Sequence, residues 1–347
     1  MADNRFNKSL EEHFINNDIQ YNFGGWTPQD AISPSQYFWV VGGTATNKLG
    51  YSYDGLTWSA STNGNSIFTN YVIGLANDGD MWVAAGQGTN RLGYSYNGII
   101  WSASTNGNSV FNSNSSGVAW NGSMWVSVGG ANNKIAYSYD GLTWSAATNS
   151  TTIFPSQGYD VAWNGSMWVA VGGLNANNVA YSYDGINWSG SSSGSAIMNA
   201  AGRGVAWNGS MWVVVGISNV NKIMYSYDGI NWSGSTNGNS IFSTAGFGIS
   251  WNGNMWVACG SGTNKIGYSY NGIDWFVATS ANSIFTTNVY RVAWNGNLWV
   301  GAGRGTNTIG YSYDGINWFA SNNGNVIMTL DGYSVSSIPA PNLYPPR

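Results

Sequence analysis

The sequence contains very little charge. Of its 347 residues, 11 are Lys or Arg and 15 are Asp or Glu, which gives a net charge of −4 and a charged fraction of 7%. Globular domains average about 25% charged residues, so the polar surface must be built mainly from Asn, Ser, Thr and Gly. Nucleic-acid binding needs a cluster of Lys and Arg that releases counterions from phosphates. Because the sequence has no such cluster, we expect no nucleic-acid partner.

Cysteine, histidine and glutamate are almost absent. The one cysteine, Cys259, excludes a disulfide within the chain, and related segments carry Ala or Val at its position, which indicates small core packing. The only histidine is His13, and the only glutamates are Glu11 and Glu12. A His-based triad or an imidazole metal site therefore cannot form in the rest of the chain. We expect no metal and no cofactor.

Long apolar runs are also missing. No segment approaches the roughly 20 apolar residues of a membrane-spanning helix, and the N-terminal stretch MADNRFNKSLEEHF lacks the apolar core of a secretory signal. We expect no membrane span. Export by another route, a chain already mature and release by lysis all stay open, and the expected location is extracellular or on a virion surface.

A nine-residue phrase, YSYDGLTWS at residues 51–59, occurs seven times in closely related form. The spacing between successive copies is 43 or 44 residues. A period of about 40–50 residues is typical of the blades of a β-propeller. The copies begin at Tyr51, Tyr94, Tyr137, Tyr181, Tyr225, Tyr268 and Tyr311.

Each repeat predicts four short antiparallel strands, in segments such as GVAW, MWVAVG, KIAYSYDG and LTWSAA. Val, Ile, Tyr and Trp are typical of strands. Asn164-Gly165 illustrates the link between the first two segments, and Asp140-Gly141 the link between the last two; both dipeptides favour hairpins. Seven such units predict an all-β fold, a seven-bladed β-propeller. A linear β-solenoid is the alternative, although its coils are usually shorter.

The C-terminal stretch NNGNVIMTLDGYSVSSI begins another copy of the repeat and then stops. We expect it to close the ring as a C-terminal strand shared with blade one. The candidate of blade one itself, Ala31-Ile32-Ser33, precedes Pro34, and proline cannot donate to a strand ladder. Which of the two first strands blade one uses stays open at this point.

The extent of the repeat divides the chain into three regions. Residues 1–25 lie outside it and are expected to form an N-terminal arm that joins other virion or fibre proteins, with SLEEHF as a short helix or an anchoring arm. The propeller is predicted over 26–338. The remaining residues, 339–347, form a proline-rich tail.

The repeated phrase resembles the Asp-box of bacterial neuraminidases, whose pattern is Ser-x-Asp-x-Gly-x-Thr-Trp. Ser52, Asp54, Gly55, Thr57 and Trp58 match its key residues, without the residue between Asp and Gly. The chain is thus similar to Asp-box (BNR-like) propeller proteins, a group that includes sialidases, other glycosidases, sorting receptors and uncharacterised phage and giant-virus proteins. The resemblance implies that the box is a fold element at the outer hairpin, remote from any active site.

Variation between the boxes agrees with that structural interpretation. Asn97 and Asn271 replace the Asp in two copies, and an Asn side chain can cap its own turn as Asp does. Tryptophan is interpreted in the same way, because every Trp except Trp26 falls at one of three repeated blade positions. We expect these side chains to pack between blades. A sevenfold array of sugar-stacking platforms, which would give avidity, is the alternative.

We do not expect catalysis. A glycosidase normally uses two carboxylates about 5–10 Å apart, but the repeat region has no Glu and places most of its Asp residues in turns. The resemblance to sialidases implies six blades, an arginine triad and a Tyr/Glu nucleophile pair, and here the Glu is missing. A divergent inverting glycoside hydrolase built on aspartates such as Asp160 and Asp274 is the alternative.

The candidate site lies where the repeats vary most, in the segments that open on one face of a propeller. Counting back from the first-strand Trp places one residue of each blade at the channel mouth: Ile73, Ser116, Tyr159, Arg203, Phe247, Tyr290 and Tyr333. The next position inward adds two charged residues, Asp160 and Arg291. The predicted ligand-binding residues are Tyr159, Asp160, Arg203, Phe247, Tyr290, Arg291 and Arg304.

Aromatic and arginine side chains around a pore can hold a sugar or an anionic group by stacking and paired hydrogen bonds. Ordinary loop variation after duplication is the alternative. The function expected is a non-enzymatic, lectin-like module that recognises glycans or another host-surface ligand. A purely structural virion or fibre component, anchored through residues 1–25, is a second reading of the sequence.

Overall fold

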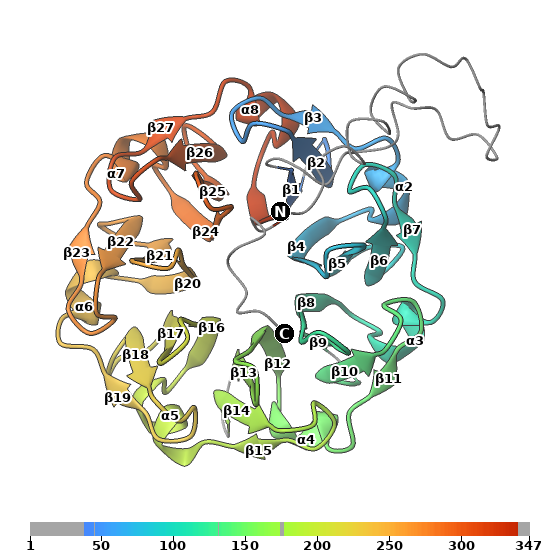
Figure 1. The fold of residues 1–347 in the computed structure, drawn as a ribbon, viewed down its shortest axis with the longest axis horizontal. Helices are drawn as coiled ribbons and strands as arrows, with labels where there is room; N and C mark the ends of the chain where they lie inside the picture. Colours follow the sequence, from blue (N-terminus) through green and yellow to red (C-terminus); the bar gives the residue numbers. More distant parts are fainter. Residues whose placement is uncertain (1–37, 45, 131, 174–176, 339–347) are drawn as a thin grey trace, which may run out of the picture. The chain divides into compact units, whose positions relative to one another are not determined.

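The structure is a computed structural model, which describes residues 38–44, 46–130, 132–173 and 177–338. These residues form seven four-stranded antiparallel sheets arranged as blades around a common axis (Figure 1). Single bridges, Gly173 to Ala201 and Ser261 to Asn288, join blade four to five and blade six to seven. The predicted seven-bladed β-propeller is confirmed. The proposed arm, the candidate strand of residues 31–33 and the tail lie outside the described residues.

The strands occupy equivalent places in all blades. The inner strands of blades two to seven are β4 (Tyr71–Asn77), β8 (Ser115–Trp120), β12 (Gln157–Trp163), β16 (Ala201–Trp207), β20 (Ala245–Trp251) and β24 (Asn288–Trp294). The second strands of blades one to seven are β1 (Trp39–Gly43), β5 (Trp82–Gln87), β9 (Trp125–Gly129), β13 (Trp168–Gly173), β17 (Trp212–Ile217), β21 (Trp256–Ser261) and β25 (Trp299–Arg304).

The two outer positions are filled by shorter strands. The third strands are β2 (Leu49–Ser52), β6 (Leu92–Ser95), β10 (Ile135–Ser138), β14 (Val179–Ser182), β18 (Ile223–Ser226), β22 (Ile266–Ser269) and β26 (Ile309–Ser312). The outermost strands are β3 (Ser59–Ala60), β7 (Ser102–Ala103), β11 (Ser145–Ala146), β15 (Ser189–Gly190), β19 (Ser233–Gly234), β23 (Phe276–Val277) and β27 (Phe319–Ala320).

The outermost strands are shorter than the predicted LTWSAA segment. Only two residues pair in each, because the box Trp turns inward and is buried, as Trp144 is. A short helix then leads to the next blade, which the sequence interpretation did not anticipate. The helices are α2 (Gly64–Ile67), α3 (Gly107–Val110), α4 (Ser150–Ile153), α5 (Ser192–Ile197), α6 (Gly238–Ile241), α7 (Ala281–Ile284) and α8 (Gly324–Ile327).

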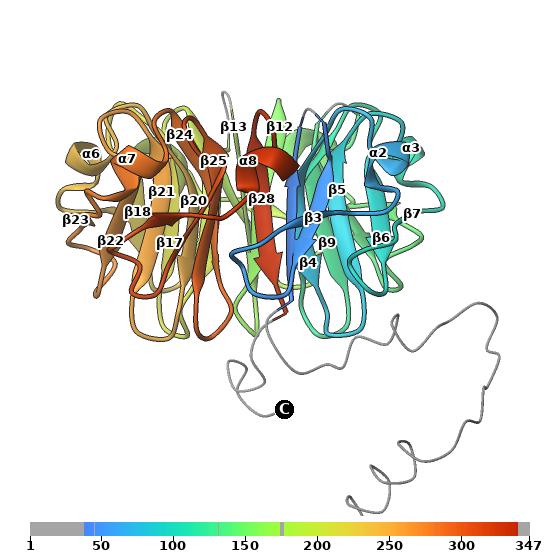
Figure 2. The ribbon, with the colours of Figure 1, turned by 90° about the horizontal axis from the view of Figure 1, so that it is seen from above.

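The ring is closed by β28 (Gly332–Ser337), which forms the inner strand of blade one. It pairs antiparallel with β1, with Trp39 opposite Ser337 and Val41 opposite Val335. The predicted closure by a shared C-terminal strand is therefore confirmed. The Ile338 amide also donates to the Phe38 carbonyl oxygen over 3.1 Å, so the described chain enters and leaves the propeller at one face. In Figure 2 that face is the lower one, toward which β28 runs.

The repeated phrase forms the turn between the third and fourth strands, which is the place expected from the sequence. In blade three, Asp140 Oδ1 accepts the amides of Leu142 and Thr143 over 2.8 and 2.7 Å. The Trp144 indole donates to the Gly141 carbonyl over 3.1 Å. The expected capping by the Asx side chain is confirmed, although the connection is longer than a tight two-residue hairpin because six residues separate β10 from β11.

The Asp and Asn residues of the repeated turn occupy opposite positions in different blades, and the hydrogen bond between their side chains is kept. In blade four, Asn187 donates its side-chain amide to Asp184 Oδ2 over 2.8 Å. In blade six the residues are reversed, and Asn271 donates to Asp274 Oδ2 over 2.9 Å. The substitution seen in the sequence therefore preserves the turn.

These turns predict a loss of stability in acid. Burial acts to raise the pKa of Asp184, but hydrogen bonds from Asn187 and Ile186 outweigh it and lower the pKa from 3.8 to about 2. The same balance lowers the pKa of Asp228 to about 2. A carboxylate whose pKa is depressed by folding stabilises the native state above its unfolded pKa of about 3.9, and that contribution is lost as the pH falls through the folded pKa.

We therefore expect the urea midpoint to fall steeply between about pH 4 and pH 2. A double variant, Asp184→Asn with Asn187→Asp, reproduces the reversed pair of blade six and removes the amide-capped carboxylate from blade four. Urea unfolding from pH 5 to pH 2 should show a shallower decline for this variant than for the wild type. Identical declines would mean that the box carboxylate does not contribute.

A second repeated contact joins each blade to the next. Asn106, which precedes α3, accepts the Trp144 amide over 2.8 Å and donates to the Trp144 carbonyl over 2.8 Å. The last of these contacts links Asn323 of blade seven to Trp58 of blade one, so it closes the ring a second time. The seven pairs are Asn63–Trp101, Asn106–Trp144, Asn149–Trp188, Ser193–Trp232, Asn237–Trp275, Ser280–Trp318 and Asn323–Trp58.

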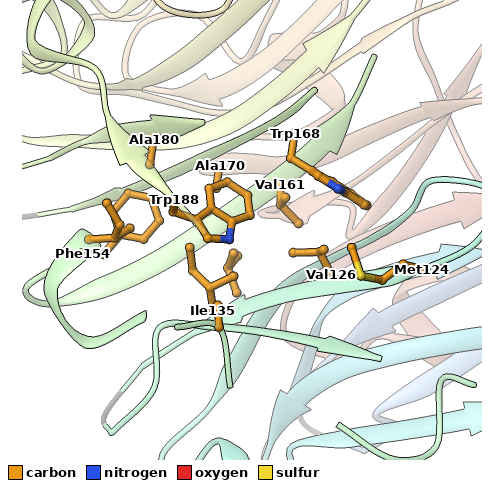
Figure 3. Close-up of a cluster of buried hydrophobic side chains, with 12 residues drawn as sticks. Met124, Val126, Ile135, Phe154, Val161, Trp168, Ala170, Ala180 and Trp188 are labelled. Atoms are coloured by element: carbon orange, nitrogen blue, oxygen red, sulfur yellow. The ribbon is translucent and has the colours of Figure 1, made fainter. Parts of the chain in front are cut away.

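The hydrophobic core lies between neighbouring blades. Figure 3 shows Met124 and Val126 of blade three beside Val161 and Trp168 of blade four, with Trp188 among them. Both tryptophans are buried, which is the packing role expected from the sequence. Among the described residues, no helix is long and apolar enough to cross a membrane.

Candidate functional site

Every inner strand contains a β-bulge at the same position. In β12, for example, Gly158 pairs with Gly172 and Asp160 pairs with Val171, which leaves Tyr159 without a partner in the ladder. A bulge adds one residue to a strand and redirects its side chain. The bulged residues are Ile73, Ser116, Tyr159, Arg203, Phe247, Tyr290 and Tyr333. They are the seven residues predicted for the channel mouth.

The bulged residues surround a cavity of about 380 Å³. Two further side chains, Tyr71 and Gln157, begin β4 and β12 and were missed by the sequence interpretation. Each stands two residues before a bulge, so the two-residue period of a strand was the signal that pointed to them. The residues lining the cavity are Tyr71, Ile73, Ser116, Gln157, Tyr159, Arg203, Phe247, Tyr290, Arg291 and Tyr333.

One half of the cavity wall is aromatic. The ring centroids of Phe247 and Tyr290 are 5.4 Å apart, those of Tyr290 and Tyr333 are 4.8 Å apart, and those of Tyr333 and Tyr71 are 5.9 Å apart. The Tyr290 hydroxyl accepts a hydrogen bond from Asn288 over 3.0 Å. Burial raises the pKa of both Tyr290 and Tyr333, so their hydroxyls stay protonated and the wall carries no charge at neutral pH.

The other half is polar. The Ser116 hydroxyl accepts hydrogen bonds from Gln157 over 2.7 Å and from Asn114 over 2.9 Å. In the next two blades, the Arg203 guanidinium lies 3.8 Å from the centroid of the Tyr159 ring, which is a cation–π contact. The cavity therefore presents an apolar wall on one side and hydrogen-bonding groups on the other.

An ion pair connects two blades that are not neighbours. Arg291 Nη2 of blade seven lies 3.4 Å from Asp160 Oδ1 of blade four, and Arg291 Nη1 donates to the Phe247 and Arg203 carbonyls. Asp160 Oδ2 accepts the Val205 amide over 3.1 Å. Burial raises the pKa of Asp160, although the Arg291 charge and backbone amides act against it. The pair thus links blade seven to blade four.

Five of the seven predicted ligand-binding residues line the cavity: Tyr159, Arg203, Phe247, Tyr290 and Arg291. Asp160 is not part of the lining and is paired with Arg291. Arg304 is not part of it either. Its side chain is 48% exposed at the end of β25, and its Nε lies 3.6 Å from Asp331 Oδ1. Asp331 accepts the Tyr333 hydroxyl over 3.2 Å, so Arg304 supports the aromatic wall from outside.

The described residues contain no group of three His, Cys, Asp or Glu side chains placed to hold a metal ion. The single cysteine, Cys259, is buried beside the inner strand of its own blade. Burial raises its pKa to about 12, which keeps the thiol protonated and unreactive. The chemistry offered by this site is hydrogen bonding, stacking and positive charge.

No protein-family model matches the sequence, and no curated protein matches it. Solved structures do resemble the chain. YCF48 bound to D1 peptide is 16% identical over 74% of this chain and 84% of that one, with a TM-score of 0.53. YCF48 from Cyanidioschyzon merolae is 15% identical over 72% and 84%, with a TM-score of 0.50. The computationally designed protein Ika8 is 14% identical over 78% and 79%, also with a TM-score of 0.50.

These similarities establish the class of the protein. YCF48 is a β-propeller, and the present chain has the same fold with seven blades. At identities this low, the likeness concerns the fold alone.

Proposed function

We propose that the protein is a non-enzymatic carbohydrate-binding module whose site is the cavity formed by the seven bulged residues. The observation that carries the proposal is the division of the cavity into an aromatic wall, Phe247–Tyr290–Tyr333, and a polar half that contains Arg203. A sugar ring has an apolar C–H face and a polar edge. The face can stack on aromatic rings while the edge bonds to the polar side chains.

Binding rather than hydrolysis is supported by the charges at the site. Within the described parts of the chain, no carboxylate lines the cavity. The nearest acid on the inner strands, Asp160, is occupied by Arg291 and by the Val205 amide. A glycosidase needs two carboxyl groups on either side of the bond that it breaks, and this cavity offers neither of them.

The points at which the described residues enter and leave the propeller support a role in display. The described residues enter at Phe38 and leave at Ile338 on the face toward which β28 runs, whereas the bulges and the cavity lie near the other end of the inner strands. The cavity therefore lies on the opposite side of the described propeller from these two points. Together with the Asn-, Ser- and Thr-rich surface and the resemblance to Asp-box proteins of phages, this favours a place on an extracellular or virion surface.

We expect the purified chain to bind specific glycans on an array, and Tyr290→Ala to weaken the best of these interactions at least tenfold by loss of a stacking surface. The control is Tyr139→Ala, which removes an exposed tyrosine from the box turn on the hairpin side. Titration calorimetry of both variants separates the two surfaces. If both variants weaken glycan binding equally, the binding site does not lie in the cavity. A folded protein that binds no glycan would favour the purely structural role.

A further inference from the structure

Arg203 differs from the other two arginines near the cavity in having no anionic partner. Arg291 pairs with Asp160, and Arg304 pairs with Asp331. No carboxylate of the described residues lies within ion-pair distance of Arg203. Its Nε atom is buried and has no hydrogen-bond partner. A buried donor of this kind is ordinarily satisfied in a folded protein, so the Arg203 guanidinium, which lines the cavity, has unused hydrogen-bonding capacity.

The surroundings of Arg203 favour an anion. The Tyr159 ring covers one face of the guanidinium at 3.8 Å, and hydrogen bonds to a guanidinium form in its own plane. Burial lowers the pKa of Arg203, Tyr159 acts against this effect, and the nearby charge of Arg291 lowers the pKa further. A bound negative charge would relieve both effects. The protein as a whole has a net charge of −4, so the unmatched cation in its cavity is a local feature.

Arg203 also stands beside the aromatic wall. It belongs to blade five, and Phe247, at the same bulge position, belongs to blade six. The wall continues from Phe247 through Tyr290 to Tyr333. A ring that stacks on this wall can therefore direct a substituent toward the guanidinium in the adjacent blade.

We propose that the cavity binds an acidic sugar, with a uronic-acid carboxylate paired to Arg203 and the sugar ring stacked on the Phe247–Tyr290–Tyr333 wall. This inference rests on the proposed carbohydrate-binding function and specifies its ligand. The carboxylate is favoured over a neutral hydroxyl because its two oxygens match the paired N–H groups of a guanidinium and neutralise its charge.

The test compares acidic oligosaccharides with neutral forms of the same chains. Oligomers of galacturonate, glucuronate and mannuronate, and their carboxyl-reduced counterparts, are titrated calorimetrically into the full chain. We expect at least one uronate to bind ten times or more tightly than its reduced form. Arg203→Gln should abolish that preference, and Arg203→Lys should retain part of it, because a lysine keeps the charge but loses the planar pair of donors.

Lys222→Gln is the charge-matched control, since it removes one positive charge from a loop outside the cavity lining. It should leave the preference unchanged, and thermal unfolding checks that each variant is folded. Equal affinity for the acidic and the reduced forms would overturn the acidic-sugar proposal. If Tyr290→Ala weakens the binding of both forms, the carbohydrate site itself still stands. Stronger binding of sulfated than of uronate oligomers would also overturn it. No binding of any oligosaccharide would overturn both proposals.

Discussion

Replacing Gly141 with alanine is expected to destabilise the protein by about 3 kcal/mol. Gly141 has a φ of +70°, where a side chain costs about 1–2 kcal/mol. An added Cβ would also collide with Met81 Cε of the preceding blade and lie 3.2 Å from Trp125 Nε1, and overpacking of a buried site costs about 1–3 kcal/mol more. The collision lies between blades, and the Met81 side chain must shift to relieve it. Urea unfolding of the variant measures the change.

The matched control lies in the same blade. Gly122 has a φ of +99°, and a Cβ at that position would meet no atom within 4 Å. Gly122→Ala should therefore cost only the backbone term, about 1–2 kcal/mol. The difference between the two variants reports the contact between blades two and three. Equal losses would show that the box glycine is needed for its conformation alone.

The second large effect is expected from removal of β28. A chain that ends at Asp331 loses the inner strand of blade one, including the buried Val335 and the pairing of five β1 residues with β28. The edge of β1 would then be exposed, and Trp39 and Val41 would lose their cover. Unpaired buried backbone groups cost about 1–3 kcal/mol each, so we expect the melting temperature to fall by about 10 °C or more, or the protein to aggregate through the open edge.

A chain that ends at Ile338 is the control, because it retains β28 and lacks only residues 339–347. Its melting temperature should equal that of the full-length protein. Size-exclusion chromatography and differential scanning calorimetry of the two truncations compare the loss of closure with the loss of the tail. An unchanged melting temperature after truncation at Asp331 would mean that blade one does not depend on its shared strand.

The ring and the mouth of the cavity could be predicted because both depend on periodic features. The 43- or 44-residue spacing of the boxes defines the blades. Within a blade, the bulge lies four residues before the last residue of the inner strand, which is Asn77 in the blade of Ile73 and Trp207 in the blade of Arg203. Because side chains two residues apart in a strand point to the same side, the residue two positions before each bulge is also expected to face the cavity. Applying this rule would have added Tyr71 and Gln157 to the predicted site.

Contacts across the ring could not be predicted in this way. The pairing of Asp160 with Arg291 joins blades four and seven, and it depends on the diameter of the ring and on the reach of the arginine side chain. The same limitation explains why Arg304 was predicted as a ligand contact although it does not line the cavity. Its place in a variable segment suggested a ligand contact, but Asp331, the residue that precedes β28, lies within 3.6 Å of it. Repeats identify equivalent positions, whereas these contacts join positions that are not equivalent.

The short helices were missed for a different reason. Segments such as TNGNSIF contain Gly, Asn and Ser, which are poor helix formers, and the helices have only four to six residues. They are fixed by tertiary contacts instead. Asn63 bonds to both backbone groups of Trp101 in the next blade, and Phe68 after α2 is fully buried. The recurrence of the segment was the available signal, but its role appears only when neighbouring blades are side by side.

The bulges give the site an unusual freedom to diverge. Because a bulged residue is not part of the ladder, it can be exchanged without changing the pairing of the residues on either side, and the seven blades already carry Ile, Ser, Tyr, Arg, Phe, Tyr and Tyr there. Each blade therefore contributes one variable residue to a recognition surface of seven residues. A library randomised at these positions alone could yield new ligand specificities on an unchanged scaffold.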